Sequence, residues 1–229
     1  MQSDRQTDTA PADDEVGWAA ARMAMVDVVR RYGIKNPRVL AALGKVRRHR
    51  FIPVDQRRHD VAYADHPWSI GHGQTISQPY IVAYMTERLD VQAGDTVLEV
   101  GTGSGFQSAV LAELGATVFT IERLPELAEH ARTVLAAEGY AGRVSVRVGD
   151  GSAGWPEQAP FDAIIVTCAA ETVPLRLVEQ LGEGGRMILP VGPEAGAQRL
   201  VIIRKHRGRV EQVDDLPVRF VPLIGGSSG

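Results

Sequence analysis

The hydrophobic and polar positions divide the 229-residue chain into two parts with different periodicities. From residue 96 onward, the β-branched runs TVLEV, TVFTIE, RVSVRVGD and FDAIIVT alternate with helical spacing at residues 104–114, 125–138 and 174–181. This alternation predicts a mostly parallel α/β sheet with helices on both faces and ligands at the carboxyl ends of the strands. The later runs RMILPVG, QRLVIIRKH, RVEQVDDL and VRFVPLI predict an antiparallel C-terminal edge with a hairpin at Gly208.

The first part of the chain has helical spacing. Helices are predicted at residues 16–32, with Gly33 at the C-terminal cap, after Asn36 and Pro37, and again in SQPYIVAYMTERL. Between the last two, the chain from HRFIP to HPWSIGHGQTIS shows no sustained period and is predicted to be a long ordered loop, a feature that often carries function. We expect one domain, 16–229, with a substrate loop in the helical part 16–95 and the ligand-binding core in 96–229.

Composition narrows the class of protein. The 25 basic and 28 acidic residues leave a net charge of -3, so no strong field favours nucleic acid or a membrane surface as a partner. Residues 1–15 are polar and acidic, lack the features of a secretory signal, and are expected to form a disordered tail. No apolar run is long enough to span a bilayer. We expect a cytoplasmic monomer.

The cysteine and histidine residues exclude an internal disulfide and weigh against a cysteine nucleophile and a metal site. A single cysteine, Cys168, excludes an internal disulfide and fits a reducing compartment. No histidine is placed to activate it, so a buried apolar role is favoured over a nucleophile. The six histidines lack the spacing of metal ligands, and no metal site is expected.

A glycine loop follows the first strand of the core. The stretch EVGTGSGFQ contains Gly101, Gly103 and Gly105, whereas a dinucleotide fingerprint would have its third glycine at the position of Phe106. This spacing weighs against NAD. The tight turn and the close approach of the main chain that Gly101 and Gly103 permit remain available to another ligand. A purely structural turn is the alternative, because such glycine turns are common.

Two acidic residues end the next two predicted strands. Glu122 could accept hydrogen bonds from both hydroxyls of a ribose, and Asp150, which precedes Gly151, could meet an adenine amino group. Each acid alone is ordinarily a solvated surface charge. Together with the glycine loop they predict a nucleoside site.

The predicted nucleoside is not a phosphate ester. The chain has no phosphate-binding loop, and Glu99, just before the glycine loop, would repel a pyrophosphate and tolerate cationic groups. S-Adenosylmethionine combines a ribose and an adenine with a sulfonium and an ammonium. It is therefore the cofactor that best matches Glu99, Glu122 and Asp150.

Longer motifs resemble the protein-L-isoaspartate O-methyltransferases in their bacterial form, over roughly residues 25–225. They are GHGQTISQPYIVAYMTERL, DTVLEVGTGSGFQSAVLAEL, ERLPELAEHA, FDAIIVTCAA, GGRMILPVG and VRFVPL. The resemblance implies a Rossmann-like methyltransferase fold. It also implies a protein repair reaction, in which the methyl group of S-adenosylmethionine moves to the α-carboxylate of L-isoaspartyl residues in damaged proteins and peptides. The ester would then close to a succinimide, whose hydrolysis returns part of it to aspartate.

The resemblance also implies roles for individual residues. Ser77 matches the family's active-site serine, and Thr75 and Ile76 belong to the same loop. The positions that match the cofactor motifs are Gly101, Thr102, Gly103, Glu122, Asp150 and Gly151. The strand that would lie along the substrate backbone supplies Val218, Phe220, Val221, Pro222 and Leu223.

The chemistry of the acceptor restricts what Ser77 can do. A carboxylate is already ionised at neutral pH, so neither a general base nor a serine nucleophile is required. The Ser77 hydroxyl is expected to hydrogen-bond the carboxylate and align it. The alternative is that Ser77 caps the helix that follows it.

Other functions are compatible with parts of the pattern. Trp68 and residues 170–172 depart from the family pattern and bear on the acceptor. One alternative is an S-adenosylmethionine-dependent methyltransferase of a different carboxylate, either a small molecule or an aspartate in a dedicated peptide. A second is a nucleoside-binding module without turnover, and the last is an NAD-dependent dehydrogenase, which Phe106 disfavours.

Overall fold

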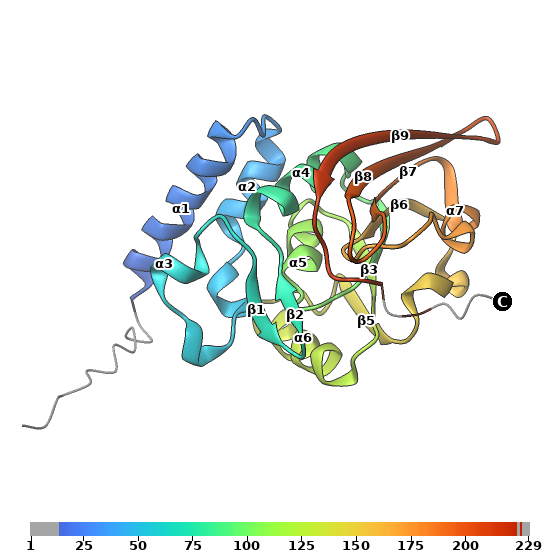
Figure 1. Cartoon of the computed structure of the whole chain (residues 1–229). Coiled ribbons are helices and arrows are strands. Elements are labelled where there is room, and N and C mark those ends of the chain that lie inside the picture. Colours follow the sequence, from blue (N-terminus) through green and yellow to red (C-terminus); the bar gives the residue numbers. More distant parts are fainter. Residues whose placement is uncertain (1–13, 224, 226–229) are drawn as a thin grey trace, which may run out of the picture.

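The computed structural model describes residues 14–223 and residue 225, and its centre is a seven-stranded sheet (Figure 1). The strand order is β5-β4-β3-β6-β7-β8-β9. The first five strands in this order are parallel, whereas β8 and β9 pair antiparallel, so the predicted sheet with an antiparallel edge is confirmed. The strands are β3 (Thr96–Val100), β4 (Thr117–Glu122), β5 (Val144–Val148), β6 (Phe161–Val166), β7 (Leu181–Val191), β8 (Gln198–His206) and β9 (Arg209–Val218).

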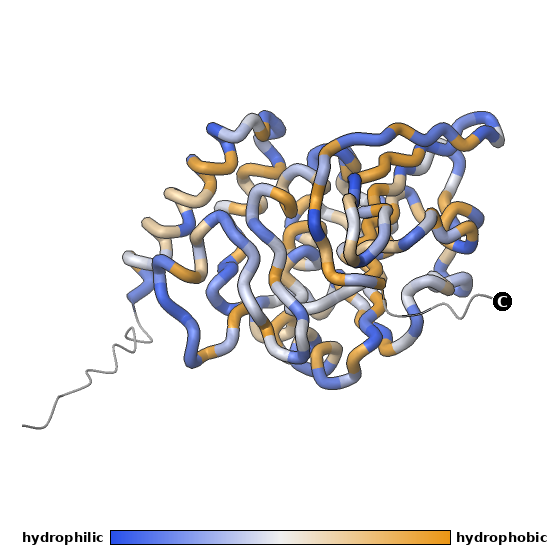
Figure 2. Tube along the Cα trace, in the orientation of Figure 1, coloured by the Kyte–Doolittle hydropathy of each residue, from blue (hydrophilic) through white to orange (hydrophobic). Residues whose placement is uncertain are grey.

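Helices cover both faces of the sheet, as predicted. Alternate residues of β3 separate into two hydrophobic clusters: Val97 packs with α4, α5 and α6 on one face, and Leu98 packs with α7 on the other. The central strands therefore have long hydrophobic stretches (Figure 2). These helices are α4 (Pro79–Leu89), α5 (Phe106–Glu113), α6 (Pro125–Ala137) and α7 (Leu175–Gln180), with short 3-10 turns η3 (Gly151–Ala153) and η4 (Pro156–Gln158).

The N-terminal helices pack onto the first of these faces. Helix α1 (Glu15–Arg31) begins after Asp14, which accepts a hydrogen bond from Gly17 N, and α2 (Pro37–Lys45) begins after Asn36, which accepts from Arg38 N. The predicted cap at Asn36 is therefore confirmed. The expected disordered tail, residues 1–15, lies outside the described residues except for its last two residues, which belong to the start of α1.

The segment predicted as an irregular loop contains regular structure. It forms η1 (Arg48–Phe51), η2 (Val54–Gln56), α3 (His59–Ala62) and an antiparallel hairpin of β1 (Trp68–Gly71) and β2 (Gln74–Ile76). Elements of three or four residues are too short to show a hydrophobic period. The hairpin turn places His72 and Gly73 at positive φ, 53° and 70°, which suits a tight connection between strands.

The prediction of a strand over VRFVPLI is wrong. Strand β9 ends at Val218, and the chain then leaves the sheet edge. Ala169 N donates to Val221 O at 2.8 Å, and Leu223 N donates to Ala169 O at 2.7 Å. Strand β8 begins at Gln198, which pairs with Val218, so β8 has no strand residue left to pair with residues 219–223, and these make a single bridge, between Pro222 and Ala169. Ile224, the last residue of the predicted run, lies outside the described residues.

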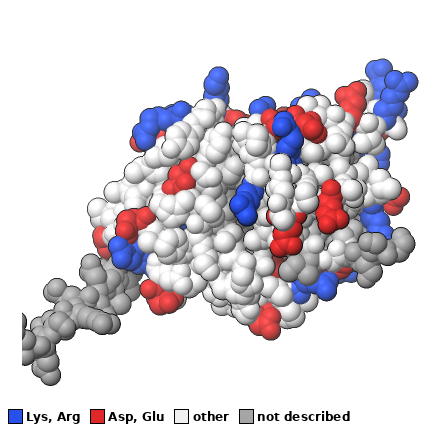
Figure 3. Space-filling view, viewed as in Figure 1, with Lys and Arg blue, Asp and Glu red and all other residues white. Residues whose placement is uncertain are grey.

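The surface carries both charges. On the face in view, Lys and Arg side chains are interspersed with Asp and Glu side chains (Figure 3). Within the described residues, no helix combines the length and apolar character needed to cross a membrane.

The packing of the sheet predicts that alanine substitutions at two leucines have very different effects on the free energy of unfolding. Leu98 is fully buried in β3, so Leu98→Ala should lower the free energy of unfolding by about 2–5 kcal/mol, measured by urea denaturation. Leu175, at the start of α7, is 74% exposed, and Leu175→Ala should change it by less than about 0.5 kcal/mol. Equal losses in the two variants would contradict this packing.

Candidate active site

A cavity lies at the carboxyl ends of β3, β4 and β6. Since β4 and β6 lie on opposite sides of β3, this is the topological switch point of the sheet, where open α/β folds bind ligands. We call it the nucleoside cavity. Its walls come from the segment between β2 and α4, the glycine loop (residues 101–105), the ends of β4 and β6, and the C-terminal segment (residues 218–223). The lining residues are Gln74, Thr75, Ile76, Ser77, Val82, Val100, Gly101, Thr102, Gly103, Ser104, Phe106, Gln107, Ile121, Glu122, Arg123, Leu124, Gly151, Thr167, Cys168, Val221, Pro222 and Leu223.

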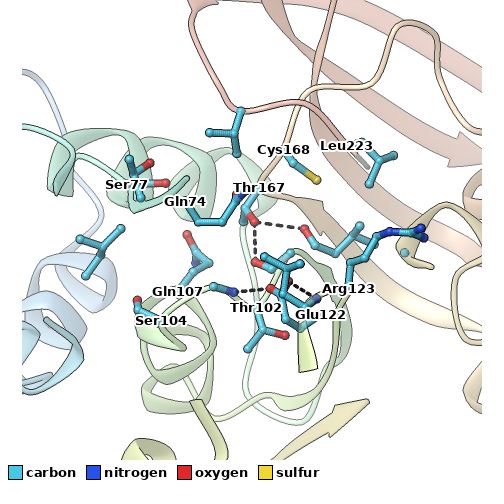
Figure 4. A pocket seen from close by; sticks show the side chains of 18 of the residues that line it. Gln74, Ser77, Thr102, Ser104, Gln107, Glu122, Arg123, Thr167, Cys168 and Leu223 are labelled. Atoms are coloured by element: carbon cyan, nitrogen blue, oxygen red, sulfur yellow. Dashed lines mark hydrogen bonds between the residues drawn. The ribbon is translucent and has the colours of Figure 1, made fainter. Parts of the chain in front are cut away.

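Gly101 makes the turn after β3 possible. Its φ is +94°, and a Cβ added there would lie 2.5 Å from Thr167 Oγ1, so a side chain would be strained and would clash. The Thr167 hydroxyl lies 2.6 Å from the carbonyl oxygen of Gly101 and 3.1 Å from that of Val100 (Figure 4). The loop therefore presents main chain to the cavity.

Glu122 holds the same loop from the end of β4. Glu122 is 7% exposed, and its carboxylate accepts hydrogen bonds from Gly103 N at 2.8 Å and from Leu124 N at 3.0 Å. Each carboxylate oxygen can accept more than one hydrogen bond, so both oxygens keep capacity for a ligand. The predicted pairing of a ribose diol with Glu122 is geometrically available.

Two further predicted residues, Thr102 and Gly151, also line the nucleoside cavity. The Thr102 hydroxyl is 2.7 Å from the Thr120 hydroxyl, which fixes its rotamer. Gly151 lies against β3, where an added Cβ would be 2.3 Å from Val100 Cγ1. Glycine is therefore required at this wall.

Asp150 is placed beside this cavity, not in its wall. Its carboxylate accepts hydrogen bonds from Ser152 N at 2.9 Å and Ser152 Oγ at 2.8 Å. The wall at this point is formed by Gly151. The contact between Asp150 and an adenine amino group stays a prediction.

The structure does not place Glu99 where the sequence argument requires it. Its side chain is fully buried and is not part of the cavity wall, because β3 is covered on both faces and position 99 faces α5. The Ser108 hydroxyl donates to its carboxyl group. Burial raises the pKa of Glu99 to about 8, so at neutral pH it is mainly uncharged and offers no negative charge to a cationic ligand.

A second cavity adjoins the nucleoside cavity, and we call it the acceptor cavity. It is lined by Pro67, Thr75, Ser77, Gln78, Ile81, Thr167, Glu194, Pro217, Val218, Arg219, Phe220, Val221 and Pro222. The residues common to both cavities are Thr75, Ser77, Thr167, Val221 and Pro222. Ser77 thus lies where the two cavities meet, on the wall across from Glu122 (Figure 4).

Ser77 does not cap the following helix, so that alternative is wrong. The N-cap of α4 is Gln78, and no side chain of the helix start caps it. Asp65 does so from the preceding loop, since its carboxylate accepts from Tyr80 N and from Gln78 Nε2, both at 2.8 Å. No hydrogen bond of the Ser77 hydroxyl to another described residue is found, which leaves it available to a ligand.

The other predicted substrate residues all lie on these two cavities. Thr75 is common to both, and Ile76 lines the nucleoside cavity. In the C-terminal segment, Val218 and Phe220 line the acceptor cavity, and Leu223 lines the nucleoside cavity. The two hydrogen bonds with Ala169 hold this segment in place.

Some lining residues were not indicated by the sequence argument. Thr167 follows β6 directly, so the same rule that selects Glu122, a polar residue at the end of a parallel strand, would have found it. Gln107 and Phe106 belong to a helix whose residues are nearly all buried, and no polar pattern separates its cavity side from its core side.

Cys168 has the buried role expected of it. It is 8% exposed, and burial raises the pKa of its thiol to about 12, so the thiolate required of a nucleophile is absent at neutral pH. Trp68 donates from Nε1 to Gln56 Oε1 at 2.6 Å. Neither Trp68 nor any of residues 170–172 lines either cavity.

The nucleoside cavity fits a ligand without phosphate groups. Of the described residues that line it, only Arg123 is cationic, and its side chain is directed toward the outside of the cavity (Figure 4). A carboxylate, a main-chain turn and apolar side chains such as Ile121 and Leu124 remain for the ligand. This set suits the sugar and base of S-adenosylmethionine, and it lacks the positive charge that a pyrophosphate requires.

Comparisons with known proteins agree with this geometry. The family model described as Protein-L-isoaspartate(D-aspartate) O-methyltransferase matches residues 20–228. A protein-L-isoaspartate O-methyltransferase of Myxococcus xanthus is 53% identical over 202 residues, 87% of this chain and 94% of that protein. One of Methanoculleus marisnigri is 54% identical over 197 residues, 86% of this chain and 88% of that protein.

A solved structure extends the comparison to the fold. It is described as a protein-L-isoaspartate O-methyltransferase of Plasmodium falciparum in complex with S-adenosyl-L-homocysteine, and it matches with a TM-score of 0.78 and 25% identity. The match covers 88% of this chain and 97% of that chain. The resemblance inferred from the sequence motifs is confirmed: the chain belongs to the protein-L-isoaspartate(D-aspartate) O-methyltransferase family.

Proposed function

We propose that this protein repairs damaged proteins and peptides by moving the methyl group of S-adenosylmethionine to the α-carboxylate of their L-isoaspartyl residues. The observation that carries the proposal is the meeting of the nucleoside cavity and the acceptor cavity at Ser77. The relative from Plasmodium falciparum, which binds S-adenosyl-L-homocysteine, supports the choice of donor.

The donor side is built from the glycine loop and the end of β4. Glu122 accepts the ribose hydroxyls, Gly101 and Gly103 present main chain, and Gly151, packed closely against Val100, forms the wall beside the base. When bound, S-adenosylmethionine supplies an electrophilic methyl group on its sulfonium. Asp150 is positioned next to this wall to contribute to recognition of the adenine.

The acceptor carboxylate has to be aligned with the methyl group, but it does not have to be activated by a base. The Ser77 hydroxyl donates a hydrogen bond to the carboxylate, which is ionised at neutral pH and needs no base. Val218 and Phe220 contact the peptide beside the isoaspartyl residue. Ile76, Phe106 and Leu223 close the cavity against water, so that proximity and orientation supply the rate enhancement, worth on the order of 7–11 kcal/mol in well-oriented systems.

The partners follow from the same chemistry. They are isoaspartyl-containing proteins and peptides, because the acceptor cavity is lined by the consecutive residues 217–222, along which a peptide main chain could lie. Nucleic acid and membranes are not proposed as partners, since the net charge is -3 and both signs are interspersed on the face in view in Figure 3. We place this activity in a cytoplasmic monomer.

The first test is methyl transfer to matched peptides. The purified protein should transfer labelled methyl groups from S-adenosylmethionine to a synthetic isoaspartyl peptide and leave its aspartyl twin unlabelled. Equal labelling of the two peptides would contradict repair. Binding of S-adenosylmethionine without labelling of either would point to a different carboxylate acceptor or to a binding module.

The second test concerns Ser77. Loss of a hydrogen bond to a charged group costs about 1.5–3 kcal/mol, so Ser77→Ala should slow turnover about ten- to hundred-fold. The Kd for S-adenosylhomocysteine should stay nearly unchanged, as measured by calorimetry. Ser69→Ala is the matched control, because Ser69 is in the same hairpin region, is exposed and lines neither cavity. A parallel loss of turnover and cofactor affinity in Ser77→Ala would show a structural role.

The third test concerns Glu122. Glu122→Gln removes the charge and replaces one acceptor oxygen with an NH2 donor, which would face a main-chain N–H, so the Kd for S-adenosylhomocysteine should rise about ten-fold or more. The turnover at saturating S-adenosylmethionine should be affected much less. Glu126→Gln, an exposed substitution in the first turn of α6, is the control and should leave the Kd at the wild-type value. An unchanged Kd in Glu122→Gln would exclude Glu122 from cofactor binding.

A further inference from the structure

Arg48 is a buried cation directly behind the wall that carries Ser77. Its relative exposure to solvent is 0%. Its guanidinium donates to the main-chain carbonyl of Ser77 at 3.0 Å and lies 5.6 Å from the ring centroid of Phe106. Ser77 and Phe106 both line the nucleoside cavity, so one charged group contacts the acceptor side and the donor side of the same wall.

The same guanidinium joins the two ends of residues 62–77. It donates to the carbonyl of Ala62 at 2.5 Å and lies 3.5 Å from the carbonyl of His66. The β1–β2 hairpin lies in the chain between these carbonyls and that of Ser77. Because Arg48 binds main chain before and after the hairpin, it fixes the position of the main chain at Ser77, between the end of the hairpin and the start of α4.

The charge of Arg48 is not neutralised by an ion pair within the described part of the chain. Its hydrogen-bond partners there are three carbonyls, and its Nε has no partner. Burial lowers the pKa of Arg48 to about 10, an effect that Tyr63 and Asp65 partly offset, so the guanidinium stays protonated at neutral pH. The other cations at the cavities, Arg123 and Arg219, are exposed, where water and salt screen their charge.

Building on the proposed function, we infer that Arg48 is a positioning residue for the acceptor. It holds the main chain of Ser77, and it supplies a positive potential that favours an ionised carboxylate beside the Ser77 hydroxyl. A charge in a low-dielectric interior acts on a nearby anion more strongly than a solvated one. The carbonyl of Ser77 is engaged by Arg48, while its hydroxyl is left to the substrate.

The test compares two peptides that differ only in charge. One contains an isoaspartyl residue, and in the other the α-carboxylate of that residue is a carboxamide. Calorimetry with S-adenosylhomocysteine present gives the Kd of each peptide. In Arg48→Met the wild-type preference for the carboxylate peptide should fall about ten-fold, equivalent to about 1.4 kcal/mol, with the Kd for S-adenosylhomocysteine changed less than about two-fold.

Two further variants separate charge from structure. Arg48→Lys keeps the charge but cannot bind the three carbonyls together, so it should retain most of the preference while its kcat falls. Arg57→Met is the matched control: Arg57 also donates to main-chain carbonyls, those of Ile52 at 3.0 Å and Arg50 at 3.1 Å, but lines neither cavity. It should leave the preference unchanged.

The outcomes distinguish an effect of the Arg48 charge on the substrate from a purely structural effect of the side chain. If Arg48→Met weakens both peptides equally, or if Arg48→Lys loses the preference as fully as Arg48→Met, the inference is overturned. Thermal melting reports whether each variant folds, and if Arg48→Met does not fold, retention or loss of the preference in Arg48→Lys decides. Failure of the wild-type protein to methylate the isoaspartyl peptide would contradict the proposed function itself, which is a separate result.

Discussion

The turn between β3 and α5 depends on one buried carboxylate. Glu122, at the end of β4, accepts hydrogen bonds from Gly103 N and Leu124 N and so ties two neighbouring strands together at the edge where the cavity opens. Two amide donors that converge on one site call for a group with two acceptor oxygens. The oxygens that shape the loop also line the cavity, so the architecture of the turn and its affinity for a sugar rest on the same atoms.

The other wall of the site is held by contacts between distant parts of the chain. The β1–β2 hairpin is formed by strands of four and three residues, too short to be stable alone. Asp65 caps α4 from outside the helix, and Arg48 binds carbonyls on both sides of the hairpin. Ser77 therefore owes its position to two side chains, those of Asp65 and Arg48, that are not among the lining residues of either cavity.

The sequence predicts the core of the molecule better than its site walls. Runs such as TVLEV and FDAIIV are long enough to show β-branched character, and Glu122 follows from the rule that parallel strands end at the ligand edge. The hairpin at residues 68–76 is too short for any period. Glu99 obeys a different constraint, since β3 is buried on both faces and its side chain cannot reach the edge. Arg48 could not be singled out, because neighbouring Arg47 and Arg50 look alike in sequence but remain partly exposed.

The composition of the acceptor cavity bears on the breadth of substrates. Its walls are main chain, short hydroxyl groups and apolar side chains such as Ile81 and Phe220. Its charged members, Glu194 and Arg219, are of opposite sign and exposed to water. A surface of this kind offers few charged groups that could select particular side chains beside an isoaspartyl residue. A shortage of such groups suits an enzyme whose targets arise by spontaneous chemical ageing at unrelated places in a proteome.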